Sequence, residues 1–121
     1  MLPTEISDSE TLFKAIKPIN HLWKEGVPSS AAFKDSKGLS VDRDGGRSKS
    51  ECIAVLQERI GTKAVVSFTA GECRSIGVMP LAKPLMNNPF HAEVHRNLTE
   101  VSLSPSQAKK LRDLAKLEIG L

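Results

Sequence analysis

Three side chains that can carry protons or bind metal ions alternate along one short segment near the end of the chain. His91, Glu93 and His95 are separated by Ala92 and Val94. This alternation predicts a strand, in which the polar side chains share one face and successive members lie about 6–7 Å apart. Imidazole and carboxylate groups are common general acids and bases. We therefore predict His91, Glu93 and His95 as catalytic residues.

The same row could hold a divalent metal ion only with help from another part of the chain. On a flat strand, His91 and His95 would stand about 13 Å apart, which is too far for both to reach one ion. Zinc, iron or manganese would then need a further ligand, such as His21 or Cys73. No metal site is assigned on this basis, and the cofactor is left open. A solvated polar strand face is the alternative explanation of the row.

Arginines are the second group that could bind a ligand. Arg43 and Arg47 flank a polar loop with two glycines, just before a predicted helix N-terminus, where backbone N–H groups attract anions. Arginine binds phosphate through two parallel hydrogen bonds. We predict that Arg43, Arg47 and Arg96 bind an anionic substrate. A surface loop with internal aspartate–arginine pairs is the alternative.

Cys73 is a candidate nucleophile. Its neighbour Arg74 could lower the pKa of the thiol, and His91 or His95 could act as the base. A buried, inert thiol is the alternative, and Cys52 has the place of a structural residue on the apolar side of a predicted helix. The two cysteines are too far apart for a CxxC motif, and we expect both to be reduced.

A further set of residues stands in a suggestive order along the chain. Lys14 lies in the first predicted strand, Ser29 and Ser30 follow, and Glu93 comes late. This order resembles that of ADP-ribosyltransferases, which have a basic residue on a first strand, hydroxyls on a second strand and a late glutamate. The resemblance covers these positions alone. A serine-rich turn is the preferred explanation of the serine pair.

Composition narrows the class of protein. The chain has 121 residues, of which 40% are hydrophobic and only 4% aromatic, and its net charge is +3. This length suits one domain over residues 1–121. Without a signal peptide or a long apolar stretch, we expect a cytoplasmic protein that does not enter a membrane. Few rings and a mild charge make nucleic-acid binding a weaker alternative. It would use the arginine loop and four basic residues of the last helix: Lys109, Lys110, Arg112 and Lys116.

The elements that must position these residues alternate irregularly, which favours an α+β fold. Capping boxes that begin at Ser48 and Ser104 predict two helices, ended by Gly61 and Gly120. Strands follow from β-branched and alternating segments, with Pro80 placed at a sheet edge and Phe90 facing the core. The predicted helices are 49–60 and about 105–118, and the predicted strands are 11–17, 38–41, 63–70, 75–82 and 90–95. We expect a small sheet of four or five mostly antiparallel strands carrying both helices, after a loose lead-in over residues 1–9.

Three functions remain compatible with these residues. The first is a small binding or accessory module without catalysis, whose partner would be a protein or an anionic ligand. The second is an enzyme that acts on a phosphate-containing or nucleotide-like substrate through His91, Glu93 and His95, with or without a divalent metal. The third is the weak nucleic-acid binder. Substrate, partner and oligomeric state do not follow from the sequence.

Overall fold

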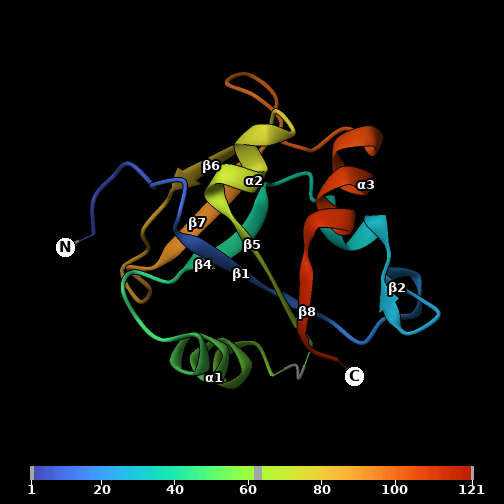
Figure 1. Ribbon diagram of the computed structural model, residues 1–121, viewed down its shortest axis with the longest axis horizontal. Coiled ribbons are helices and arrows are strands. Elements are labelled where there is room, and N and C mark those ends of the chain that lie inside the picture. Colours follow the sequence, from blue (N-terminus) through green and yellow to red (C-terminus); the bar gives the residue numbers. More distant parts are fainter. Residues whose placement is uncertain (1, 62–63, 121) are drawn as a thin grey trace.

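A six-stranded antiparallel sheet forms the centre of the computed structural model, which describes residues 2–61 and 64–120 (Figure 1). Across the sheet the strands are β6 (Met79–Ala82), β7 (His91–His95), β4 (Leu39–Arg43), β1 (Thr11–Ile16), β5 (Ala64–Thr69) and β8 (Lys116–Ile119). Every neighbouring pair is antiparallel. A separate two-stranded sheet joins β2 (Trp23–Lys24) to β3 (Val27–Pro28). The α+β class is confirmed, whereas the prediction of four or five strands is wrong.

The first helix, α1 (Lys49–Ile60), has the predicted bounds. The Ser48 hydroxyl accepts a hydrogen bond from the Glu51 N–H at 3.2 Å, which satisfies one of the free donors of the first turn. Gly61 ends the helix with a φ of 76°, a left-handed conformation that glycine adopts without steric penalty.

A second helix, α2 (Ala70–Ser75), replaces the end of one predicted strand and the start of the next. Thr69 and Glu72 form a capping box, in which each side chain accepts from the other residue's backbone N–H, at 3.0 and 2.8 Å. This local signal begins the helix directly after β5. The following strand, β6, is confined to Met79–Ala82, and Pro80 does lie in an edge strand.

The last helix, α3 (Pro105–Leu114), begins at the predicted Ser104–Gln107 capping box but is shorter than predicted. The prediction that it continues to residue 118 is wrong, because β8 (Lys116–Ile119) pairs with β5 instead. Pairing gives the backbone of β5 hydrogen-bond partners at an edge that would otherwise be open. With α2, the described residues therefore contain three α-helices rather than two.

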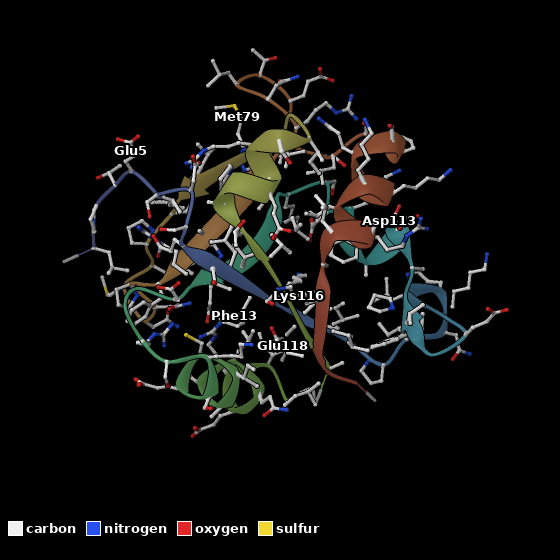
Figure 2. The ribbon with its side chains drawn as sticks, in the orientation of Figure 1. Glu5, Phe13, Met79, Asp113, Lys116 and Glu118 are labelled. Carbon is white, nitrogen blue, oxygen red and sulfur yellow. The ribbon has the colours of Figure 1, made fainter. Side chains whose placement is uncertain are left out.

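The two faces of the sheet are covered by different elements. On one face α1 packs Cys52, Ile53 and Leu56 against Phe13 and Val65. In the view of Figure 2, Phe13 and Glu118 lie on the side of the sheet nearest α1. Glu118 accepts from the Ser67 hydroxyl at 2.6 Å and pairs with Lys49 of α1 at 3.4 Å, which ties β8 to this helix.

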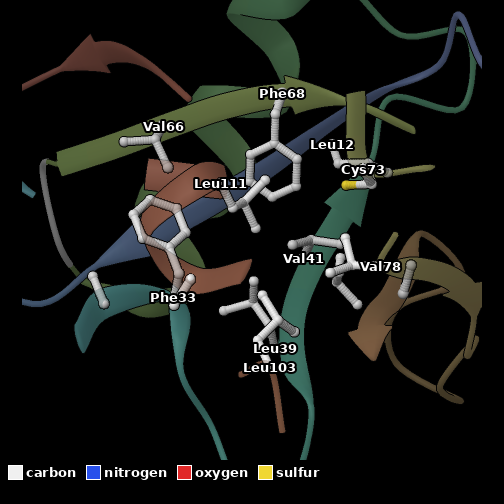
Figure 3. Close-up of a cluster of buried hydrophobic side chains, with 14 of the residues drawn as sticks. Leu12, Phe33, Leu39, Val41, Val66, Phe68, Cys73, Val78, Leu103 and Leu111 are labelled. Atoms are coloured by element: carbon white, nitrogen blue, oxygen red, sulfur yellow. The ribbon is translucent and has the colours of Figure 1, made fainter. Parts of the chain in front are cut away.

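The opposite face holds the larger core. There α3, α2 and the short 3₁₀ helix η2 (Ser30–Phe33) cover the strands (Figure 3). Phe33 meets Phe68 edge to face, with ring centroids 6.5 Å apart. Leu111 of α3 is fully buried within this cluster. Each of the two cores therefore fixes the orientation of the strands that carry the candidate site residues.

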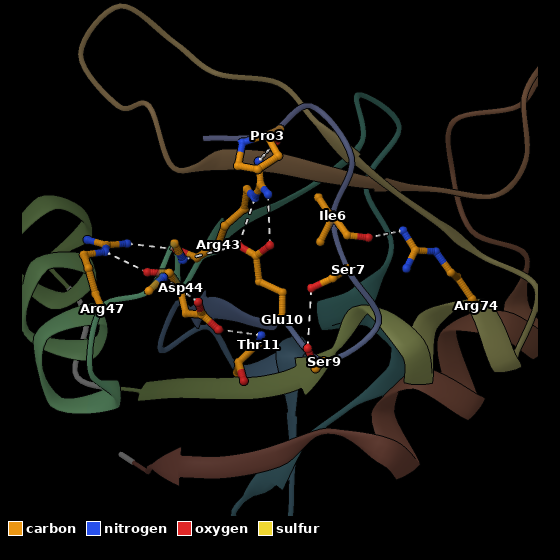
Figure 4. Close-up of polar contacts among 12 residues, drawn as sticks. Pro3, Ile6, Ser7, Ser9, Glu10, Thr11, Arg43, Asp44, Arg47 and Arg74 are labelled. Atoms are coloured by element: carbon orange, nitrogen blue, oxygen red, sulfur yellow. Dashed lines mark hydrogen bonds and ion pairs between the residues drawn. The ribbon is translucent and has the colours of Figure 1, made fainter. Parts of the chain in front are cut away.

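The segment before β1 is attached to the sheet. The sequence predicted a loose lead-in over residues 1–9, of which residues 2–9 are described. Ile6 is buried in the larger core. The Arg74 guanidinium donates to the Ile6 carbonyl at 2.6 Å (Figure 4). It also donates to the Asp8 carboxylate at 2.6 Å. These contacts hold the segment against α2.

Candidate functional site

A cleft of about 520 Å³ opens where β1 and β4 separate within the sheet. The two strands pair only at Leu12–Arg43 and Phe13–Asp42, while β1 stays paired with β5 as far as Ile16. One wall of the cleft is therefore formed by residues 13–17, which are the end of β1 and the residue after it. The other wall is formed by residues 40–42 of β4. Because the opening lies between strands, side chains from both faces of the sheet reach it.

Lys14 is the most unusual residue of the cleft. It stands on the same strand face as Leu12 and Ile16, both buried in the larger core. Burial lowers the pKa of its ammonium group below 10.5, with Asp35 acting in the opposite direction. Among the described residues, the Lys14 ammonium has neither a hydrogen bond nor an ion pair. A partly buried, unpaired cation in a cleft is a candidate ligand contact.

Cations outnumber anions around this opening. The charged residues that line it are Lys14, Lys17, Lys34, Arg59, Asp35 and Asp42. Asp42 is already neutralised, because it is only 2% exposed and accepts from Arg59 at 2.7 Å and from the Asn88 amide at 3.0 Å. Phe13, Leu56 and Ile60 add apolar surface. The cleft thus combines net positive charge with an apolar wall.

The predicted row of His91, Glu93 and His95 exists but does not converge on one point. The three side chains share one face of β7, since Ala92 and Val94 are fully buried on the other. Only His91 lines the cleft. His95 Nε2 instead lies 2.8 Å from Glu93 Oε1, and this pair packs against Gly38.

His91 is held from both sides of its ring. Its Nδ1 lies 2.8 Å from the carbonyl oxygen of Lys83, just beyond β6. Its Nε2 lies 3.3 Å from the Ser40 hydroxyl on β4. The cross-strand partner of His91 on β4 is Asp42, the residue that pairs with Arg59. The imidazole therefore has a fixed orientation at the edge of the cleft.

Two of the predicted anion-binding arginines instead bind groups of their own chain near the start of β1 (Figure 4). Arg43 is buried and donates to both carboxylate oxygens of Glu10 and to the Pro3 carbonyl. Arg47 donates to the carbonyls of Asp44 and Arg43.

Arg47 also explains why the prediction that Phe90 faces the core is wrong. The Arg47 guanidinium lies 3.5 Å from the centroid of the Phe90 ring, a cation–π contact, and Phe90 belongs to neither core cluster. Phe90 precedes β7 rather than belonging to it.

Arg96, the third predicted arginine, also has local partners. It donates to the Ser102 carbonyl at 2.7 Å and to the Glu100 carboxylate at 3.1 Å. These bonds close the loop between β7 and α3. All three arginines thus have structural contacts, and none of them lines the cleft between β1 and β4.

The other candidates of the sequence are dispersed. Over residues 2–61 and 64–120 no group of three or more histidine, cysteine or acidic residues could hold a metal ion. His21 is exposed on the 3₁₀ helix η1 (Asn20–Leu22), and Cys73 is buried in the larger core. Burial raises the pKa of the Cys73 thiol to about 12, so the thiolate needed for nucleophilic attack does not form near neutral pH.

The residues ordered as in ADP-ribosyltransferases are not brought together. Lys14 lines the cleft, whereas the Ser29 hydroxyl donates to the His21 carbonyl at 2.8 Å and Glu93 contacts His95. Sequence reasoning did not identify Arg59, Asp35 or Asn88 as part of a site. A signal for the cleft was nevertheless present: Lys14 is a charged residue between Leu12 and Ile16 on the buried face of its strand.

Each helix within the described ranges lacks the length and the apolar run that a bilayer-spanning segment needs. The chain matches no protein-family model, no curated protein sequence and no solved structure.

Proposed function

We propose that this protein is a binding module for a small anionic molecule, which it holds in the cleft between β1 and β4. The observation that carries this proposal is the Lys14 ammonium, which is partly buried and unpaired within the described chain. Removing an ammonium group from water is unfavourable unless another group replaces the lost interactions. Asp35 favours the charged form of Lys14 but forms no ion pair with it within the described chain, so a phosphate or carboxylate of a ligand would supply the missing direct contact.

The dimensions and the walls of the cleft favour a small organic anion over a macromolecule. A volume of about 520 Å³ is typical of small-molecule sites. Lys17 and Lys34 add positive charge beside Lys14, and Phe13 and Leu56 offer apolar contacts. An anion with a short apolar or planar body, such as a nucleotide, fits this combination better than an inorganic ion alone.

Calorimetric titration with pyrophosphate and adenosine monophosphate tests the proposal. We expect at least one of them to bind the wild-type chain, and to bind Lys14→Met at least tenfold more weakly, because a charge-assisted contact contributes about 1.5–3 kcal/mol. The control is Lys109→Met, which removes an exposed cation from α3. Absence of binding, or equal weakening by both substitutions, would contradict the proposal.

An enzymatic function is the second candidate, and it is supported through one residue only. Of the three residues predicted as catalytic, His91 alone lines the cleft and holds a fixed ring orientation. A reaction at this site would therefore depend on His91 and its immediate neighbours rather than on the whole row.

A further inference from the structure

We infer that Ser40 and His91 form a nucleophile–base pair for acyl transfer at the edge of the cleft. The inference starts from the hydrogen bond of 2.8 Å between His91 Nδ1 and the Lys83 carbonyl oxygen. A carbonyl oxygen can only accept, so Nδ1 carries the proton of this bond. In a neutral imidazole, Nε2 then has a free lone pair. That nitrogen faces the Ser40 hydroxyl at 3.3 Å, so Ser40 is the donor.

This arrangement contains the three parts of an activated serine: a nucleophile, a base and a group that orients the base. Here the Lys83 carbonyl takes the orienting place that a carboxylate has in the serine–histidine–aspartate triad. The distance of 3.3 Å is slightly longer than in a tight catalytic hydrogen bond, as is common before a substrate is bound.

The sheet holds all three parts in place. Ser40 lies on β4 and His91 on β7, and the register pairs Ser40 with Glu93 and His91 with Asp42, which makes Ser40 and His91 diagonal neighbours on one face. Lys83 follows β6, and its N–H donates to the His91 carbonyl at 3.0 Å. Lys83 and His91 are therefore joined by two reciprocal hydrogen bonds. A site built on paired strands keeps its geometry better than one built on loops.

Both reacting groups are accessible to a substrate. Ser40 is exposed, and Ser40 and His91 line the same cleft as Lys14 and Arg59. Arg59 forms an ion pair with Asp42, the cross-strand partner of His91, so this pair lies beside the dyad without adding net charge. The choice of an anionic ester as substrate rests on the function proposed above, whereas the reactivity of the dyad does not.

The reaction would proceed in two balanced steps. Ser40 Oγ attacks the carbonyl carbon of the ester, its proton passes to His91 Nε2, and the bond between that carbon and the leaving oxygen breaks as His91 returns the proton to the departing alcohol. Water then attacks the acyl group on Ser40 and gives up a proton to Nε2, and this proton passes to Ser40 Oγ as the carboxylic acid leaves.

A fluorophosphonate probe tests the dyad directly, because an activated serine displaces its fluoride and keeps the phosphonyl group. We expect one adduct on the wild-type chain, mapped to Ser40 by peptide mass spectrometry. The adduct should be absent in Ser40→Ala and unchanged in Ser36→Ala, which removes an exposed serine nearby in sequence. Labelling of His91→Gln should be at least tenfold slower, since a positioned base typically contributes about 10²–10⁴-fold. No adduct at Ser40, or equal rates with His91→Gln, would overturn the inference.

A second measurement does not depend on the folding of a variant. Long-range ¹H–¹⁵N NMR of the wild-type chain reports the tautomer of His91, and we expect the proton on Nδ1. A proton on Nε2 alone would overturn the inference. Titration of the wild-type chain with pyrophosphate, beside the labelling of the same chain, separates the two proposals. Anion binding without Ser40 labelling would refute the dyad alone, and Ser40 labelling without anion binding would refute the proposed ligand alone.

Discussion

Arg43 and Glu10 form a two-point ion pair beside the first residue of β1. Arg43 Nε lies 3.0 Å from Glu10 Oε2, and Nη2 lies 2.9 Å from Oε1. The side chains are only 3% and 11% exposed. The pair joins the N-terminal segment to β4, so a residue that the sequence suggested for ligand binding instead stabilises the fold.

Glu10→Gln should therefore destabilise the protein strongly. The substitution leaves the buried Arg43 guanidinium without a counter-charge, and loss of one partner of a buried pair typically lowers the free energy of unfolding by about 3–5 kcal/mol. Urea unfolding followed by circular dichroism measures the change. Glu58→Gln, on the exposed side of α1, is the control and should stay within about 0.5 kcal/mol of wild type. Equal urea midpoints for the two variants would show that the ion pair does not stabilise the folded protein.

Lys14→Met should stabilise the protein, in contrast to most substitutions of a half-buried residue. Burial lowers the pKa of Lys14 below 10.5, so the folded state binds this proton less well than the unfolded state. The charged form therefore weakens folding at neutral pH, and this penalty decreases as the pH rises toward 10.5. We expect a higher urea midpoint for Lys14→Met at pH 7 and a smaller difference from wild type at about pH 10.

The comparison at two pH values is what makes the Lys14 experiment specific. Both proteins contain the same cysteines and acids, so the titration of those groups cancels in the difference. A gap that stays constant between the two pH values would mean that the methionine stabilises by packing rather than by removal of a charge.

Gly38→Ala should separate Glu93 from His95. Gly38 has a φ of +105°, and a Cβ there would lie 2.6 Å from Glu93 Oε1 and 3.0 Å from His95 Nε2. We expect a loss of about 1–3 kcal/mol from the backbone conformation, together with a shift of the His95 ring signals in NMR spectra. Gly77→Ala is the matched control, because its φ is +82° but nothing lies within 4 Å of its Cβ. If His95 signals move equally in both variants, the contact with Gly38 is not what positions this pair.

Both thiols should resist modification in the folded protein. Cys52 and Cys73 are fully buried, and burial raises the pKa of Cys52 and raises that of Cys73 to about 12. With a disulfide reagent at about pH 8, we expect almost no reaction before denaturation and reaction of both thiols after it. Since the unfolded Cys73 titrates near 9.0, stability should also decline as the pH rises from 9.0 toward 12. Rapid reaction of one thiol in the native protein would mean that its part of the core opens readily.

Local signals were sufficient to predict some elements but not others. The Ser48 cap and Gly61 defined α1 correctly, because both act within one turn of the helix that they delimit. The end of α3 could not be read in this way. Leu117 and Ile119 leave the helical pattern to pair with Val66 and Val65, and that competition depends on an open strand edge formed about fifty residues earlier.

The candidate site also has features that one segment of sequence predicts and features that depend on how distant strands pair. That His91, Glu93 and His95 share a face follows from the two-residue period of a strand. That Ser40 meets His91, and that Lys14 lines an opening, depends on how β4 pairs with β7 on one side and separates from β1 on the other. Strand order is a long-range property, and no spacing within one segment reveals it.

The ladder between β1 and β4, here called the seam, is short. It divides the six-stranded sheet into two three-stranded leaves, β6–β7–β4 and β1–β5–β8. Separating the leaves disrupts the pairing of two residue pairs, whereas separating β1 from β5 disrupts six. The ladder between β1 and β4 is therefore the shortest in the six-stranded sheet, and widening of the gap at its unpaired end would leave the ladders within each leaf intact. A ligand could enter between the leaves without unfolding of either one, and substitutions that alter the width of the gap would leave those ladders unbroken.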